Sequence, residues 1–390
     1  MNIIEIISKK TLREDNVQML LGTEIKLRRN ALSKTLLDVS QDTCSVSYLS
    51  KVENSEIKPN PLFLADICKR VNLTNQNITS IKDSKEIFQR GISAIYQNDL
   101  HELEVLYELV FDLKNYRAKI TKLMYMLATN NLRVSKRIIS ELEKIESSMP
   151  LNDLIILAYL EAWYNFKVYD LKESFTVLKV LLDYNCGFTY FDSLCLKLMV
   201  DTYYRINSPL FLENSYALRK KYLRHNSFEK VKELEKVQLT YMLYNGLLHS
   251  AKKRMSELII VDETFKTLFA VFDGSDIDTN FSKYTYANVL YLYTRNRNEF
   301  KNVYENKMID ATEDELKLLG YLYDKEFSKD FYNKLSSVYL PYAYEVKNYY
   351  LIKEFTYALA DLLKRQSRYK RCVEVYEKYY ETLKECEYYC

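Results

Sequence analysis

The sequence predicts an all-α protein, and three observations support this fold class. Six glycines and five prolines in 390 residues are too few for the turns of a large β-sheet protein. From about Ser84 to the C-terminus, apolar residues recur at three- and four-residue spacing, which is the period of one helix face. Short polar turns divide this pattern into segments of about one helix length or more. A chain of this length and ordinary globular composition has room for two or three domains.

Eleven polar breaks separate the helices that we expect in the larger, C-terminal part of the chain. They fall near residues 98–99, 130–131, 149–152, 169–170, 185–187, 207–209, 226–227, 245–246, 274–278, 296–298 and 367–368. A stretch rich in Asn, Thr and Ser, residues 72–83, has no apolar period and predicts a domain boundary, with a linker at 77–84. Residues 1–16 are expected to form an arm, either partly ordered or packed on a partner subunit or on DNA.

Two expected hairpins share one pattern, in which a small residue on each helix allows close approach and large side chains follow on the second helix. The residues are Ala162, Ser174, Leu178 and Leu181 in one hairpin, and Ala360, Cys372, Tyr376 and Tyr379 in the other. The spacing resembles that of divergent tetratricopeptide repeats, which have about 34 residues per unit. The resemblance implies a right-handed helical solenoid over residues 85–390 with a concave inner surface, although the full consensus is nowhere present.

A different pattern stands near the N-terminus, in the stretch RRNALSKTLLDVSQDTCSVSYLSKVEN from Arg28 to Asn54. It predicts two short helices, residues 33–39 and 45–54, joined by a tight turn. Ser45 is a favourable N-cap for the second helix, and Leu49 and Val52 lie three residues apart where they can anchor it. Small polar residues and a lysine remain on its other faces. This is the arrangement of a helix-turn-helix motif.

The block from Gly22 to Leu73 resembles the Xre/Cro-type helix-turn-helix domain of bacterial and phage repressors. Arg28 and Glu53 have the spacing at which that family pairs a buried arginine with a glutamate, and Asn54 follows. Two prolines, Pro59 and Pro61, then introduce a further helix, LFLADICKRVNL. The resemblance implies a five-helix DNA-binding domain over residues 17–76.

The second helix departs from the family pattern and leaves two alignments open. Counting from Arg28 places Thr35 at the base-contacting position but Asp38 at a position that is normally apolar. Aligning the leucines instead places Lys34 at that position and lengthens the turn.

Because the net charge is only +3, affinity for nucleic acid requires a local basic patch. Lys26, Arg28, Arg29 and Lys34 are expected to form one. We expect base contacts from Ser47 and Lys51, with Val46 against a thymine methyl, although Lys51 could equally be a phosphate contact. The complete expected set of DNA-contacting residues is Arg29, Lys34, Thr35, Ser45, Val46, Ser47, Tyr48, Ser50, Lys51, Asn54 and Lys58.

The concave surface of such a solenoid commonly holds an extended peptide. From helical phase, the expected peptide-binding residues are Tyr159, Trp163, Asn165, Phe166, Lys167, Thr240, Tyr244, Asn288, Arg295, Asn296, Tyr357 and Lys364. Each has a structural alternative, since aromatic residues at helical spacing often belong to the core and exposed lysines are often only solvated. Asn165 and Asn288 are notable because asparagine is a poor helix former.

The remaining patterns argue against catalysis and against a membrane. The sequence has no phosphate-binding glycine motif, its three histidines are isolated, and its seven cysteines include no CxxC pair. We therefore expect no enzymatic activity, no cofactor and no metal, and we expect reduced thiols in a cytoplasmic protein. No apolar run is long enough to span a bilayer.

The domain order, helix-turn-helix followed by tetratricopeptide-like repeats, resembles the RNPP family of peptide-responsive transcription regulators (the Rgg, PlcR and PrgX kind). The resemblance implies a cytoplasmic homodimer that binds a palindromic operator on double-stranded DNA. It also implies a short linear signalling peptide, of the quorum-sensing type, in the concave groove. Two alternatives remain: a ligand-independent repressor of a phage or mobile element, and a helical-repeat scaffold for protein interactions.

Overall fold

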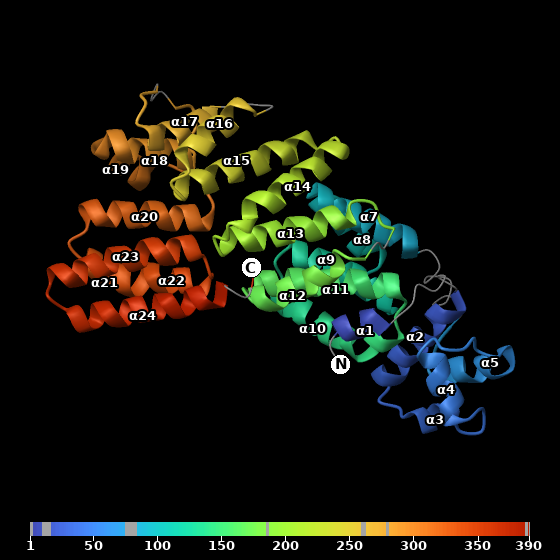
Figure 1. Ribbon diagram of the computed structural model, residues 1–390. Coiled ribbons are helices and arrows are strands. Elements are labelled where there is room, and N and C mark those ends of the chain that lie inside the picture. Colours follow the sequence, from blue (N-terminus) through green and yellow to red (C-terminus); the bar gives the residue numbers. More distant parts are fainter. Residues whose placement is uncertain are drawn as a thin grey trace. The chain divides into compact units, whose positions relative to one another are not determined.

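The computed structural model describes residues 3–9, 17–74, 84–184, 187–258, 263–277, 281–386 and 389. Within these residues the regular structure is helical, apart from one isolated bridge between Thr285 and Asp310, so the predicted all-α class is confirmed. The chain forms two compact units, Met1–Met199 and Val200–Cys390, and the division falls inside helix α13 (Phe191–Arg205; Figure 1).

The first unit begins with short helices. They are α1 (Ile3–Lys9), α2 (Val17–Ala31), α3 (Leu36–Ser40), α4 (Val46–Glu53) and α5 (Pro61–Arg70). Helices α2 to α5 enclose a small apolar core: Leu21, Ile25, Val39, Leu49, Val52, Ile67, Cys68, Val71 and Leu73. The helix expected at 33–39 is shorter than predicted because Thr35 caps it, so its first residue is Leu36.

Helical hairpins follow in the first unit, each helix packing against the next. They comprise α7 (Ser84–Gln97), α8 (Leu100–Leu109), α9 (Tyr116–Ala128), α10 (Leu132–Leu142), the 3-10 helix η1 (Glu143–Ser148), α11 (Leu151–Lys167) and α12 (Leu171–Leu181). Helix α1 buries Ile3, Ile6 and Ile7 and packs against α11 and η1 of its own chain. The N-terminal arm therefore has an intramolecular site, which the sequence did not indicate.

The second unit continues with further helices, which range from 4 residues in α21 to 18 in α24. They are α14 (Leu210–Arg224), α15 (Phe228–Tyr244), α16 (Leu248–Ser256), α17 (Glu263–Asp273), α18 (Tyr286–Arg295), α19 (Arg297–Asn306), α20 (Glu313–Phe327), α21 (Phe331–Lys334), the π-helical turn η2 (Leu335–Tyr339), α22 (Leu340–Glu345), α23 (Tyr349–Arg365) and α24 (Tyr369–Cys386).

Many of the predicted breaks coincide with helix ends, and their asparagines explain why. Asn98, Asn130, Asn207 and Asn226 follow helices and have φ between 53° and 59°, a left-handed conformation that asparagine tolerates at a helix C-terminus. Other helix ends lack such a residue and were not predicted, including the turn at residues 110–115 between α8 and α9. The breaks at 185–187 and 274–278 lie partly outside the described residues.

The small residues of the C-terminal hairpin lie where the sequence predicts. The Cys372 thiol on α24 lies 3.7 Å from the carbonyl oxygen of Ala360 on α23, and both residues are buried. Ala162 on α11 and Ser174 on α12 are also fully buried. Close helix approach at small residues is therefore confirmed in the C-terminal hairpin, whereas in the other hairpin the structure shows that the two small residues are buried.

The compact units do not follow the predicted domain boundary. Most of the expected linker, 77–84, lies outside the described residues, and Ser84 already begins α7. Helix α2 packs against α9 and η1, so the helices α2 to α5 belong to the same compact unit as the hairpins that follow. We refer to α2 to α5 as the N-terminal bundle.

Candidate functional site

Helix α4 presents one buried face and one exposed face, as its sequence predicts. The Ser45 hydroxyl accepts a hydrogen bond from the backbone N–H of Tyr48 (3.1 Å) and caps the helix. Leu49 and Val52 are buried against the bundle core. Ser47 and Lys51 are exposed, with Val46 beside them, whereas Ser50 is half-buried. The exposed face therefore carries small polar groups and one cation.

Two of the residues expected to contact DNA make bonds within the protein. The Tyr48 hydroxyl accepts a hydrogen bond from the backbone N–H of Asn60 (2.5 Å), which caps α5. Asn54 ends α4, and its side-chain oxygen accepts a bond from the Lys26 ammonium group (3.3 Å). Both side chains therefore help to hold the bundle together. Lys58, in the loop before α5, is exposed.

The ion pair that the resemblance places between Arg28 and Glu53 is wrong by one residue. Arg29 is the partner, with Nε and Nη2 donating to the two Glu53 carboxylate oxygens at 2.7 and 2.8 Å. Successive residues of a helix are 100° apart around its axis, so Arg29 faces α4 while Arg28 turns to Glu24, one turn earlier (3.0 Å). Arg29 is thus held inside the bundle, and its expected DNA contact has no structural support.

The predicted basic patch is neutralised or occupied within the protein. Besides the two arginines, the Lys26 ammonium donates to the Ser147 hydroxyl (2.9 Å), and the Lys34 ammonium donates to the carbonyl of Arg70 (2.7 Å). Among residues 17–74 with described side chains, the exposed charged residues are Lys51, Lys58 and Lys69, and the acidic Asp38, Asp42, Glu56 and Asp66. The exposed surface of the bundle therefore has no excess of positive charge.

The structure also explains why Asp38 stands where the family pattern is apolar. Thr35 is the N-cap of α3, and its backbone N–H and hydroxyl donate to the Asp38 carboxylate at 2.7 and 2.8 Å. Asp38 is exposed in this capping box, and the backbone hydrogen bond from Thr35 holds its pKa below the usual value. The core position is taken by the next residue, Val39, which is fully buried.

The expected peptide-binding residues divide between the two units. In the first unit, Tyr159 is buried and packs edge-on against Phe191 (5.6 Å between centroids), which makes it part of the core. Lys167 lies over the Trp163 ring (5.5 Å) and donates to Asn130 (3.2 Å). Phe166 is half-buried beside them on α11.

In the second unit, most of the expected residues serve local structure. Tyr244 stacks on Tyr350 and its hydroxyl meets that of Tyr286. The others make short-range bonds or ring contacts: Thr240 to Lys236, Asn288 to Lys283, Arg295 to Gly274 and Ser275, Asn296 as the cap of α19, Tyr357 with Tyr376 and Tyr379, and Lys364 over Tyr376. These contacts do not define a common groove.

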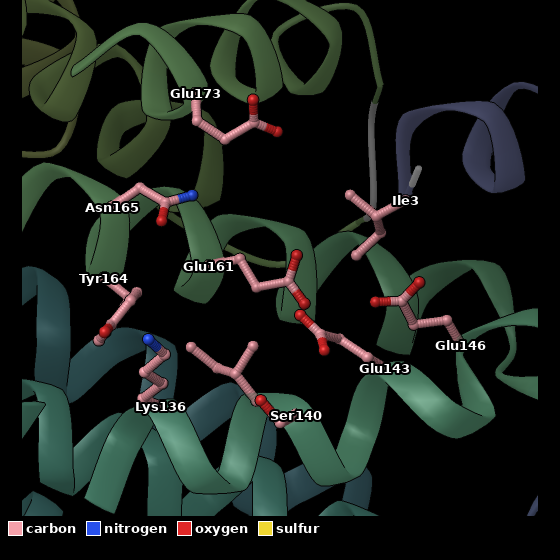
Figure 2. Close-up of a pocket in the computed structure, with 10 residues that line it drawn as sticks. Ile3, Lys136, Ser140, Glu143, Glu146, Glu161, Tyr164, Asn165 and Glu173 are labelled. Atoms are coloured by element: carbon pink, nitrogen blue, oxygen red, sulfur yellow. The ribbon is translucent and has the colours of Figure 1, made fainter. Parts of the chain in front are cut away.

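Asn165 lies at a cavity of about 560 Å³ in the first unit, between α1, α10, η1, α11 and α12. The lining residues are Ile3, Lys136, Ile139, Ser140, Glu143, Glu146, Glu161, Tyr164, Asn165 and Glu173. Figure 2 shows the carboxylates of Glu143 and Glu161 pointing toward one another from η1 and α11. We call this site the acidic cavity, because its lining includes four glutamates and one lysine.

Burial sets the protonation of the acidic cavity. It raises the pKa of Glu146 to about 7, and the nearby Glu143 carboxylate adds to this shift. Burial and the same two neighbouring carboxylates raise the pKa of Glu161 well above its ordinary value. Glu161 and Glu146 share a hydrogen bond, while the Glu161 Oε1 atom is buried with no hydrogen-bond partner among the described residues.

The sequence does not reveal this cavity, because its glutamates stand in separate helices and each alone has the pattern of a solvated surface residue. One signal was available, since Glu161 stands in the otherwise apolar run AYLEAW of α11. An acidic residue there must either reach solvent or be buried at a cost.

Comparisons of the chain with protein-family models, with curated proteins and with solved structures find no match. Among the described residues, no helix combines the length and apolar character needed to cross a membrane. The same residues contain no group of three or more His, Cys, Asp or Glu side chains arranged to hold a metal ion.

Proposed function

We propose that the protein is a sequence-specific DNA-binding transcription regulator whose N-terminal bundle reads double-stranded DNA through α4. The observation that supports this most is the geometry of α4, a capped helix anchored by Leu49 and Val52 with Ser47 and Lys51 on its outer face. A helix held in this way can enter the major groove and contact base edges with small polar and cationic side chains.

The DNA surface proposed here is narrower than the sequence indicates. It consists of Val46, Ser47, Lys51 and Lys58, with Thr35, Ser50 and Ser45 at its margin. Arg29 and Lys34 stabilise the bundle instead. With so few free cations, each protomer holds DNA weakly, so a homodimer on a two-fold operator is the arrangement that we propose. We further propose that the regulator acts in the cytoplasm and that a short signalling peptide controls it, bound by the helical repeats.

Selection of genomic DNA fragments on the purified protein tests this function, with Lys51→Ala and Lys69→Ala as matched variants. Lys69 is an exposed lysine at the far end of α5 and serves as the control. We expect enrichment of a two-fold-related site that is lost with Lys51→Ala and retained with Lys69→Ala. No enrichment over random DNA, with or without peptide extracts, would contradict the proposal.

A second candidate function is a protein-interaction scaffold in which the bundle no longer binds DNA. The occupied basic patch favours it, because Lys26, Arg28, Arg29 and Lys34 all make bonds within the protein. In that case Lys51→Ala and Ser47→Ala would leave any promoter binding unchanged, while partner capture would depend on the helical repeats.

A further inference from the structure

The acidic cavity has the chemistry of a site for a positively charged group. Glu143 and Glu146 come from η1, Glu161 from α11 and Glu173 from α12, and among the described lining residues Lys136 on α10 is the one cation. The Glu161 Oε1 atom is buried and lacks a hydrogen-bond partner among the described residues. A buried oxygen atom without a hydrogen-bond partner is costly, and an ammonium group that enters the cavity could donate to it and remove that cost.

The rest of the lining suits an alkylammonium group. Tyr164 and Asn165 add a hydroxyl and an amide that can accept hydrogen bonds, and Ile3 and Ile139 add apolar surface for a carbon chain. A cavity of about 560 Å³ is large enough for a side chain with part of a backbone, and it falls in the size range of small-ligand sites.

Helix η1 joins this cavity directly to the N-terminal bundle. Glu143 and Glu146 of η1 line the cavity, whereas the next two residues hold the bundle. The Ser147 hydroxyl accepts from Lys26 (2.9 Å), and the Ser148 carbonyl accepts from the hydroxyls of Thr23 (2.7 Å) and Ser55 (3.2 Å). Thr23 and Lys26 lie on α2, and Ser55 is the second residue after α4. Within the six residues of η1, two thus line the cavity and two bond to α2 and to the chain that follows α4.

We propose that the acidic cavity binds the ammonium group of the effector, a lysine side chain or amino terminus of a short peptide, and that η1 transmits its occupancy to α2 and α4. This inference rests on the proposed function and adds to it the charge and location of the effector. The mechanism is a shift between two positions of η1, limited by the difference in effector affinity between them.

Binding can be measured without DNA, because Trp163 is the single tryptophan and lies on α11 two residues after Glu161. The probes are two pools of random heptapeptides, identical except that one has a fixed lysine where the other has norleucine, with spermidine as a third probe. We expect the lysine pool to change Trp163 fluorescence and the norleucine pool to have no effect. A response to spermidine alone would overturn the peptide assignment.

Variants then locate the site. Glu146→Gln should weaken binding of the lysine pool about tenfold or more, since it removes a charged partner of the ammonium group. Glu161→Gln should have a smaller effect, because the raised pKa of Glu161 keeps that carboxyl protonated near neutral pH. Glu108→Gln, at an exposed position on α8, should leave binding unchanged. Lys136→Met removes the cation that competes for the carboxylates and should tighten binding several-fold. Because this variant is expected to gain affinity, misfolding cannot imitate the result.

Affinity should also rise between pH 6 and pH 8, because the glutamates must ionise to hold a cation and the pKa of Glu146 is about 7. The charged groups that face the ligand are Lys136, Glu143, Glu146, Glu161 and Glu173. Equal binding of both pools, or binding unaffected by all three cavity variants, would overturn the proposal.

Transmission by η1 is tested by hydrogen exchange with the lysine pool present. We expect altered protection of residues 143–148 and of α2, and no change in α24. Binding without a change in η1 or α2 would leave an acidic ligand site but refute its coupling to the bundle. Neither readout involves DNA, so failure of DNA selection alone would count only against the proposed function.

Discussion

Both compact units bury carboxyls and phenols, but burial raises carboxyl pKa values mainly in the first unit and phenol pKa values mainly in the second. In the first unit the buried groups include carboxyls, and burial raises the pKa values of Glu24 and Glu146 to about 7. In the second unit they include phenols, and burial raises the pKa values of Tyr244, Tyr286 and Tyr350 further above their already basic range. The first unit can therefore change charge near neutral pH, whereas these phenols of the second unit stay neutral.

In the second unit, a group of polar contacts around Arg205 and Asp314 joins neighbouring helices. Arg205 donates to the carbonyl of Val346 (2.5 Å) and lies 3.7 Å from Asp314. Asp314 in turn accepts from the Tyr342 hydroxyl (2.8 Å) and the Asn348 amide (3.0 Å). These bonds tie α13, α20 and the start of α23 together within the unit. These contacts of the second unit are therefore structural, whereas the cavity proposed to bind an effector lies in the first unit.

The largest effect expected in the first unit comes from breaking the Arg29–Glu53 pair. Arg29→Ala leaves Glu53 buried without its partner, and we expect a loss of about 3–5 kcal/mol in unfolding free energy. Arg28→Ala should cost less, because Glu24 keeps its bond from the Tyr116 N–H and can take up a proton near pH 7. Urea unfolding followed by Trp163 fluorescence measures both. A larger loss of unfolding free energy for Arg28→Ala than for Arg29→Ala would indicate that Arg28 is the partner of Glu53, as the sequence resemblance implies.

Gly22→Ala should have the next largest effect. A Cβ atom at Gly22 would lie 2.0 Å from the carbonyl oxygen of Val52, so α2 and α4 could not keep their spacing. We expect a loss of about 3 kcal/mol. The matched control is Gly246→Ala in the second unit, where the added Cβ meets no atom within 4 Å and only the φ of 72° is unfavourable, at about 1 kcal/mol. Similar losses for the two variants would argue against close packing of α2 on α4.

The pH dependence of stability should differ between the units. Glu24 has a pKa of about 7 in the folded protein against 4.5 as its model value, so the folded state binds the proton more tightly. The unfolding free energy of the first unit should therefore fall as pH rises from about 4.5 to 7 and level off above, by roughly 2–3 kcal/mol for this group.

Trp163 reports the first unit alone, so its denaturation midpoint can be followed across that pH range. Glu24→Gln should make the profile less steep, with the remaining slope due to Glu146 and Glu161, whereas Glu108→Gln should leave it unchanged. A denaturation midpoint that increases steadily from pH 4.5 to 7 would contradict the raised pKa of Glu24. It would also contradict the burial of the Glu24 carboxyl against the backbone N–H of Tyr116.

The sequence predicted those parts of the structure that depend on local patterns. Helical phase located Leu49 and Val52 in the core, and the capping residue Ser45 located the start of α4. Long-range pairing was harder to predict. The choice between Arg28 and Arg29 depends on a rotation of 100° about α2, and Lys26 finds its partner Ser147 far along the chain. The acidic cavity was missed for the same reason, because its glutamates come from separate helices.

The most direct test of the central claim is the salt dependence of DNA binding by the dimer, measured with a fragment recovered by the selection. The test takes Lys51 as a phosphate contact, the second of the two roles that the sequence leaves open for it. With Lys58 it gives each protomer two phosphate-contacting cations, so the proposed dimer neutralises four phosphates. The logarithm of the association constant should then fall against the logarithm of salt concentration with a slope of about −4, and Lys51→Ala should reduce it to about −2. An unchanged slope in Lys51→Ala would contradict the assignment of α4 as the DNA-reading helix.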